Sequence, residues 1–307
     1  LMLETAYAGK IGTKIEALRQ YNPARYITDP ITGAPPSLQN VNDRVIFEPG
    51  ILSPIGFLLG NNFRSWYHSW QTQITKRFSK GLSVQGSYTL AKSIDTSSTD
   101  NLGATVSDPF NLRTERGRSD WDRRHAFVAS WLWALPFRFS NHTANSLLGG
   151  WTLTAIHSIQ SGTPLTFNIG QDIALDGTEN GGGQHAFLEP GITAGKISLS
   201  HPNRQAMVSQ FFNTGAFIPV NLLPPGQYGN ASRGLISGPA FNSTDFGVLK
   251  DFAIRESLKL QFRTEMFNLF NQVNFNNPDT TQTDTTFGQI TSAQDGRVIQ
   301  FALKLLW

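Results

Sequence analysis

The segment LKLQFRTEM at residues 258–266 alternates between apolar and polar side chains. Its even-numbered positions carry Leu, Leu, Phe, Thr and Met, and its odd-numbered positions carry Lys, Gln, Arg and Glu. Successive side chains of a β-strand point to opposite faces, so the segment predicts a strand with one apolar and one polar face. The segments LSVQGSYTL (82–90) and IQFALKLLW (299–307) show a similar period of two. These three segments predict a fold built from β-strands.

Eight such segments follow one another along the chain, and the connections between them alternate in length. Weaker strands are predicted at residues 1–9, 66–78, 125–137, 151–167 and 243–252. Each is near the roughly 9–11 residues that a tilted strand needs to cross a bilayer. The long connections are 10–65, 94–124, 168–242 and 269–296, and the short ones are 79–81, 138–150 and 253–256.

This alternation is typical of outer-membrane barrels, which have short periplasmic turns at one rim and long extracellular loops at the other. Long loops are uncommon in soluble domains and would not fall on every second connection. The sequence therefore predicts an all-β fold, an antiparallel transmembrane β-barrel segment of about 8–10 strands. The last strand then runs inward and ends at the periplasmic rim.

Composition excludes several other classes of protein. The chain has 307 residues, of which 39% are hydrophobic and 15% charged, with no cysteine and a net charge of +3. No apolar run approaches the roughly 18–20 residues of a transmembrane helix. The absence of cysteine excludes a disulfide scaffold, a thiolate zinc site and a cysteine nucleophile. The scattered basic residues form no stripe, so we expect no nucleic-acid partner.

Aromatic residues and loop composition fit a barrel but leave a soluble alternative. Six of the seven tryptophans lie in predicted strands, mostly near strand ends, as in an aromatic girdle: Trp66, Trp70, Trp131, Trp133, Trp151 and Trp307. Residues 168–190 are rich in Gly, Asn and Asp and are predicted to lack a core of their own. Tryptophans also occur in sandwich cores. The alternative is a secreted soluble β-sandwich or repeat protein that binds carbohydrate through its Trp-rich strands.

Alternation also assigns a set of polar side chains to the lumen of the predicted barrel. A charge facing lipid at the bilayer midplane costs about 2–4 kcal/mol, so the charged positions of a strand are expected to face inward. They would form a polar wall along which solute passes or against which a plug packs, or serve only lumen solvation and pairing between strands. The predicted lumen-facing residues are Gln71, Gln73, Arg77, Lys259, Gln261, Arg263 and Glu265.

Two acidic clusters are candidates for binding a metal ion, but the sequence favours a metal site at neither of them. Asp120, Asp122 and His125 are compact, but the adjacent arginines favour an ion-paired corner where a loop enters the barrel. Asp172, Asp176 and Glu179 miss the EF-hand spacing for calcium. No nucleophile elbow, phosphate-binding loop or zinc-protease motif occurs, so we expect no enzyme activity and no cofactor.

Four motifs, in this order along the chain, resemble those in the C-terminal barrel of Oar-like TonB-dependent receptors. They are KRFSKGLS (76–83) followed by SYTLAKS (87–93), SDWDRRH (119–125), GGW (149–151) followed by SGTP (161–164), and FRTEMFNLFN (262–271). The resemblance implies a barrel of about 22 strands that encloses a plug and is energised by TonB. No plug, TonB-contacting box or signal peptide is found. We therefore expect residues 1–307 to be the C-terminal part of such a receptor in the bacterial outer membrane, with an unknown solute and lipid as partners.

The last strand carries a second expectation. Its alternating apolar residues end in an aromatic residue, which resembles the signal read by the β-barrel assembly machinery through strand addition. The residues of this predicted membrane-insertion signal are Ile299, Phe301, Leu303, Leu305 and Trp307. An independent small barrel of eight strands is a further alternative, although such barrels have shorter connections.

Overall fold

A computed structural model describes residues 1–54, 57–98, 106–177, 183–255 and 258–307. Its main strands are β1 (Met2–Gln20), β2 (Phe57–Ser79), β3 (Leu82–Asp95), β5 (His125–Ala134), β6 (Trp151–Gln160), β9 (Phe241–Arg255), β10 (Leu258–Phe267) and β11 (Val298–Leu306). Short strands are β4 (Gly117–Arg118), β7 (Pro164–Leu165) and β8 (Ile236–Ser237). The helical segments are η1 (Leu38–Arg44), η2 (Leu112–Glu115), α1 (His142–Leu148), α2 (Ala194–Ile197), α3 (Arg204–Ser209), η4 (Thr214–Ala216) and η5 (Val220–Leu222).

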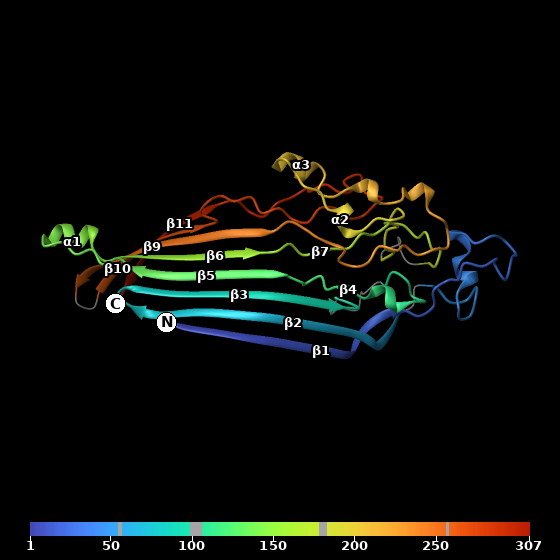
Figure 1. The fold of residues 1–307 in the computed structure, drawn as a ribbon, viewed down its shortest axis with the longest axis horizontal. Helices are drawn as coiled ribbons and strands as arrows, with labels where there is room; N and C mark the ends of the chain where they lie inside the picture. The colour runs from blue at the N-terminus through green and yellow to red at the C-terminus, as the bar shows by residue number, and fades with distance from the viewer. Residues whose placement is uncertain (55–56, 99–105, 178–182, 256–257) are drawn as a thin grey trace.

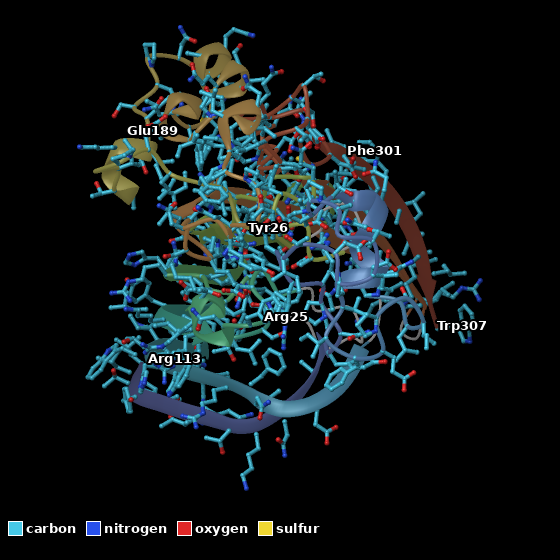
Figure 2. All side chains as sticks on the ribbon, turned by 90° about the vertical axis from the view of Figure 1, so that its right-hand side faces the viewer. Arg25, Tyr26, Arg113, Glu189, Phe301 and Trp307 are labelled. Carbon is cyan, nitrogen blue, oxygen red and sulfur yellow. The ribbon has the colours of Figure 1, made fainter. Side chains whose placement is uncertain are left out.

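The eight main strands form one antiparallel sheet in which each pairs with its neighbours along the chain. The order is β1-β2-β3-β5-β6-β9-β10-β11, and the short β4 pairs with β3. Viewed from the loop end, the sheet curves round in an open arc, with blue β1 and red β11 at its two edges (Figure 2). This confirms the all-β antiparallel prediction. None of the described helices is long and apolar enough to cross a bilayer.

Long and short connections lie at opposite ends of the sheet. Residues 21–54, 96–98, 106–124, 161–177, 183–240 and 268–297 gather at one end, while both termini and helix α1 lie at the other (Figure 1). The turn between β2 and β3 is the shortest described connection. Its two residues, Lys80 and Gly81, both have positive φ angles of 53° and 79°, as a type I′ hairpin turn requires.

Three predicted boundaries are wrong by more than three residues, each for a local reason. Strand β1 runs to Gln20 rather than residue 9, because register shifts at residues 12–17 and a positive φ of 55° at Lys14 interrupt the alternation without ending the pairing. Strand β2 accordingly begins at Phe57 rather than residue 66. Strand β6 ends at Gln160 rather than 167, where the backbone at Gly162 approaches that of Gly238 too closely for any side chain.

The two faces of the sheet differ sharply in chemistry. On β11, Phe301 and Leu303 are 72% and 69% exposed on the apolar face. The opposite face carries polar residues and is the one on which the loops pack. There Phe63 of β2 contacts Val106 and Leu112, which belong to the connection 96–124. The apolar face is thus the outer face of a barrel, and the polar face is the inner one.

Candidate functional site

The inner face of β9, β10 and β11 carries a ladder of charged and amide side chains. In the sheet register Gln261 is paired with Asp251 and with Lys304, and Glu265 is paired with Gln300. Gln261 Nε2 donates to Asp251 at 2.9 Å, and Gln300 Nε2 donates to Glu265 at 2.6 Å. Arg263 and Glu265 form an ion pair at 2.5 Å. Asp251, Arg263 and Glu265 on this edge of the inner face are therefore each held by a polar side chain on the same or a neighbouring strand.

The predicted wall residues of β2 lie on the same face but in a different place. Gln71 donates to Ser69 Oγ at 3.1 Å, and Gln73 donates to Thr75 Oγ1 at 3.4 Å. Alternation places Arg77 on this face at the turn end of the strand. Four strands separate this group from Lys259, Gln261, Arg263 and Glu265 on β10. The two groups thus lie on one face of the sheet but do not contact each other. Their role in a solute path stays a prediction.

The inner face is hollowed between these two groups. A hollow of about 340 Å³ crosses strands β3, β5, β6, β9 and β10, and its lining includes Gln85, Ser130, Thr154, Asp245 and Glu265. Hydroxyl and amide groups dominate this stretch of the face, while the charged groups belong to β9 and β10. Such a surface can hydrate or bind a polar solute.

The long connections at the loop end of the sheet have a hydrophobic core, which most of its members reach from outside residues 168–190. Phe167, Phe212 and Ile197 are fully buried, and the rings of Phe167 and Phe212 lie 4.8 Å apart. Phe287 reaches this cluster from the connection 268–297, 5.1 Å from Phe212. We call the described residues of these packed connections, 161–177, 183–240 and 268–297, the loop assembly. Residues 168–190 have few apolar side chains themselves, but they join a core supplied by distant segments.

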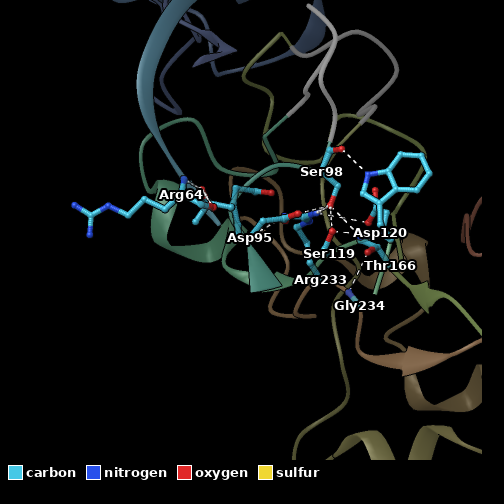
Figure 3. Close-up of polar contacts among 11 residues, drawn as sticks. Arg64, Asp95, Ser98, Ser119, Asp120, Thr166, Arg233 and Gly234 are labelled. Carbon is cyan, nitrogen blue, oxygen red and sulfur yellow. Dashed lines mark hydrogen bonds and ion pairs between the residues drawn. The ribbon is translucent and has the colours of Figure 1, made fainter. Parts of the chain in front are cut away.

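A buried arginine fastens the loop assembly to the sheet. Arg233 Nη1 lies 2.8 Å from Asp95 at the end of β3 and 3.0 Å from the carbonyl oxygen of Glu115. Its Nη2 donates to Ser98 at 2.7 Å and lies 3.5 Å from Asp120 (Figure 3). Removing one partner of a buried charge network is strongly destabilising. Arg233 therefore fixes two long connections relative to β3.

The predicted corner at Asp120, Asp122 and His125 is ion-paired. Asp122 accepts from Arg118 Nε at 2.8 Å and from the backbone N–H of Ser93 at 2.8 Å, while Asp120 faces Arg233. His125 instead contacts Tyr88, whose hydroxyl lies 2.8 Å from Nδ1. The three side chains therefore do not converge on one point.

The second acidic cluster is occupied by its own backbone. Asp172 accepts from the N–H groups of Asp176 and Gly177 at 3.2 and 2.8 Å, and Tyr228 donates to Asp176 at 2.7 Å. Glu179 lies outside the described residues. Within the described ranges no group of three metal-binding side chains is present.

Two buried titratable groups lie close to Arg233 in the connections. Burial raises the pKa of Glu115 to about 7, although the Ser107 N–H at 2.6 Å and the charge of Arg233 act in the opposite direction. Burial, with the nearby Arg233, lowers the pKa of His185 to about 4. Sequence reasoning missed Arg233, Glu115 and His185, because their burial depends on segments distant in the chain.

The outer face carries the tryptophans and the last-strand residues. Trp66, Trp70, Trp131, Trp133 and Trp151 lie in strands, and Trp307 directly follows β11. The Lys250 amine contacts the carbonyl of Gly149 and lies over the ring of Trp151, which keeps this charge near the turn end of the sheet. Ile299, Phe301, Leu303 and Leu305 are all exposed on this face. Their role as an insertion signal stays a prediction.

A comparison with known protein families assigns this architecture to a class. The outer membrane beta barrel domain family matches residues 1–300, and the chain belongs to this family. The protein is thus a β-barrel protein of the bacterial outer membrane. A search among curated proteins finds no match. The soluble sandwich alternative is wrong, because the family is a membrane one and no second sheet covers the apolar face in the described part of the chain.

Proposed function

We propose that this chain is the C-terminal barrel part of a TonB-dependent receptor that binds and imports, or exports, a large solute. The plug domain and the TonB contact would be supplied by regions outside these 307 residues. The observation that carries the proposal is the set of motifs that resemble those of Oar-like receptors. In the structure these motifs lie at strand ends and at the turns and loops that join the strands. KRFSKGLS spans the β2–β3 turn, SDWDRRH leads into β5, and FRTEMFNLFN lies on β10 and the residues after it.

The two faces of the sheet support a transport role. The exposed apolar face is suited to contact lipid, since it carries aromatic and aliphatic side chains and holds Lys250 near its end. The hollowed inner face offers amide and hydroxyl groups to a passing solute or to a plug. The packed loop assembly gives the outer end a preformed surface, which suits selective capture of a solute before transport.

Insertion into the outer membrane is proposed to use the β-barrel assembly machinery. Strand β11 is the last of the sheet and pairs only with β10 in the described part of the chain, and its alternating residues end at Trp307. Strand addition at a sheet edge is a common way for one chain to recognise another. We propose no enzymatic reaction and no nucleic-acid partner for this chain.

TonB binding by the complete protein tests the proposed function. The purified protein in detergent is expected to bind the isolated periplasmic domain of TonB in a saturable manner. Removing the region upstream of Leu1 is expected to abolish that binding while the barrel remains folded, as judged by heat-modifiable gel mobility. Failure of the complete, folded protein to bind TonB would contradict the proposal.

A further inference from the structure

A second hollow, of about 460 Å³, lies at the loop end of the sheet. Its walls come from β6, β9 and the connections that flank them. Gln160 ends β6, and Phe241 begins β9 directly opposite it. Alternation places both side chains on the inner face, the same face as Ser158 and Thr154. The hollow therefore opens away from lipid, and its volume falls within the range of about 300–1,000 Å³ that small-ligand sites occupy.

The lining combines amide and hydroxyl groups, two phenyl rings and one guanidinium group, without a carboxylate. Besides Pro239 and Ala240, the lining residues are Arg123, Gln160, Thr163, Phe241, Phe275, Asn276, Asn277 and Gln294. Asn277 and Thr163 are fixed to each other through side-chain contacts of 2.9 and 3.2 Å. One side of the hollow is thus preorganised by the protein itself.

Three other polar groups at the hollow keep hydrogen-bonding capacity to spare. In the part of the chain that the structure describes, the side chains of Gln160 and Gln294 have no hydrogen-bond partner. Arg123 Nη1 donates to the carbonyl oxygen of Ser161 at 2.7 Å, which orients its guanidinium group. The same described ranges hold no ion pair to Arg123, so its other N–H groups are left for a ligand.

We propose that this hollow binds an acidic oligosaccharide. The guanidinium group of Arg123 would pair with a sugar carboxylate, since its planar fork of donors matches that geometry. The amides of Gln160 and Gln294 would exchange hydrogen bonds with sugar hydroxyls, because an amide both donates and accepts. Phe241 and Phe275 would cover the apolar C–H face of a sugar ring. The inference names a solute class for the proposed transport function, and rests on that function for the direction from which the ligand arrives.

Titration of the purified complete protein with trigalacturonate tests this site, with its fully methyl-esterified form as a neutral probe of the same skeleton. The unmodified protein is expected to bind the acid at least tenfold more tightly than the ester, because a hydrogen bond to a charged group is lost with the ester. Arg123→Met is expected to weaken binding of the acid at least tenfold and to remove the preference for it. Gln160→Leu is expected to weaken binding of both probes.

Arg124→Met is the matched control, because Arg124 is the neighbouring arginine, donates to the carbonyl oxygen of Ala91 at 3.3 Å, and does not line the hollow. It is expected to leave both affinities unchanged. Equal binding of acid and ester by the unmodified protein, no binding of either, or equal losses in the two arginine variants would overturn the proposal. Heat-modifiable mobility shows that each variant is folded. TonB binding is measured on the same samples, so a failed sugar site with intact TonB binding leaves the proposed function standing.

Discussion

Phenylalanine takes opposite environments in the two halves of this molecule. Phe301 in the sheet is 72% exposed, whereas Phe212 in the loop assembly is fully buried among other aromatic rings. A sheet with an exposed apolar face suits a bilayer, because lipid replaces the core that a soluble protein would build. The loop assembly faces water, so its stability depends on an internal core of the usual kind. Apolar side chains are thus exposed in the sheet, where lipid would cover them, and buried in the loop assembly, where water would surround them.

The largest effect is expected from removing the end of the sheet. Deleting Phe301–Trp307 from the complete protein removes most of β11, so that β10 keeps its pairing with β9 but loses most of its pairing on the other edge. We expect loss of outer-membrane insertion, measured as the amount of protein accessible to an external protease on intact cells. Trp307→Phe keeps an aromatic ring at the last position and is expected to insert normally. Normal surface levels of the deletion variant would show that the last strand carries no insertion signal.

Truncating a buried ring in the loop assembly is expected to act on that region alone. Phe212→Ala creates a cavity in a fully buried cluster and is expected to cost the loop assembly about 3–5 kcal/mol. Hydrogen exchange of the folded protein in detergent reports this as faster exchange across residues 161–240, with β10 and β11 unchanged. Phe301→Ala is the control and is expected to leave exchange in the loop assembly unaltered. Equal responses to the two variants would remove the contrast between the regions.

Adjacent positions of β11 test the two faces of the sheet. Leu303→Arg puts a charge on the apolar face and is expected to cost about 2–4 kcal/mol of barrel stability in a bilayer. Ala302→Arg puts the same charge on the inner face, opposite Arg263 in the register, and is expected to cost less. Urea unfolding of the complete protein in lipid vesicles measures both. A larger loss for Ala302→Arg would reverse the assignment of faces.

The smallest effect concerns pH and the junction between sheet and loops. Glu115, in the connection 96–124 that packs against the loop assembly, keeps its proton in the folded protein up to a pKa of about 7, above its ordinary 4.5, so the packing between the two becomes less stable as pH rises from about 4.5 to 7. His185 has a folded pKa of about 4, below its ordinary 6.5, so stability falls as pH drops from about 6.5 to 4. The two slopes oppose each other between about pH 4.5 and 6.5.

Glu115→Gln is therefore expected to reveal the slope of His185. Stability of the loop assembly in this variant should rise from pH 4.5 to 6.5, by up to about 3 kcal/mol, while the unmodified protein changes little. Pulse proteolysis in urea at several pH values measures this. His185→Asn is the converse control and should leave stability falling as pH rises. Identical pH profiles for Glu115→Gln and the unmodified protein would contradict the role of Glu115.

The sheet was largely predictable from sequence, because the alternation of apolar and polar side chains that marks a strand lies within each strand itself. Alternation at residues 258–266 assigns both strand and face without knowledge of any partner, and the structure confirms all eight main strands. The prediction failed where pairing continues through an irregularity, as at Lys14 in β1. The loop assembly was not predictable in this way. Phe167, Phe212 and Phe287 meet from segments far apart in the chain, so no periodic pattern reveals their cluster.

The same distinction applies to the candidate site. The charged positions of β10 were assigned to one face by alternation, and the structure places them there. The network of Arg233 joins residues more than a hundred positions apart, and nothing in the local sequence marks this arginine as buried. The hollow at Arg123 depends in the same way on where β6, β9 and the connection 268–297 meet.

Cysteine accessibility along β10 tests most directly whether the polar face lines a water-filled interior and the apolar face contacts lipid. The chain has no cysteine of its own, so single cysteines at residues 259–266 give a clean signal in this region. In the complete protein in the outer membrane, a water-soluble maleimide is expected to label positions 259, 261, 263 and 265 and to spare 260, 262, 264 and 266. Equal labelling of both sets, or labelling of the even positions alone, would contradict the account.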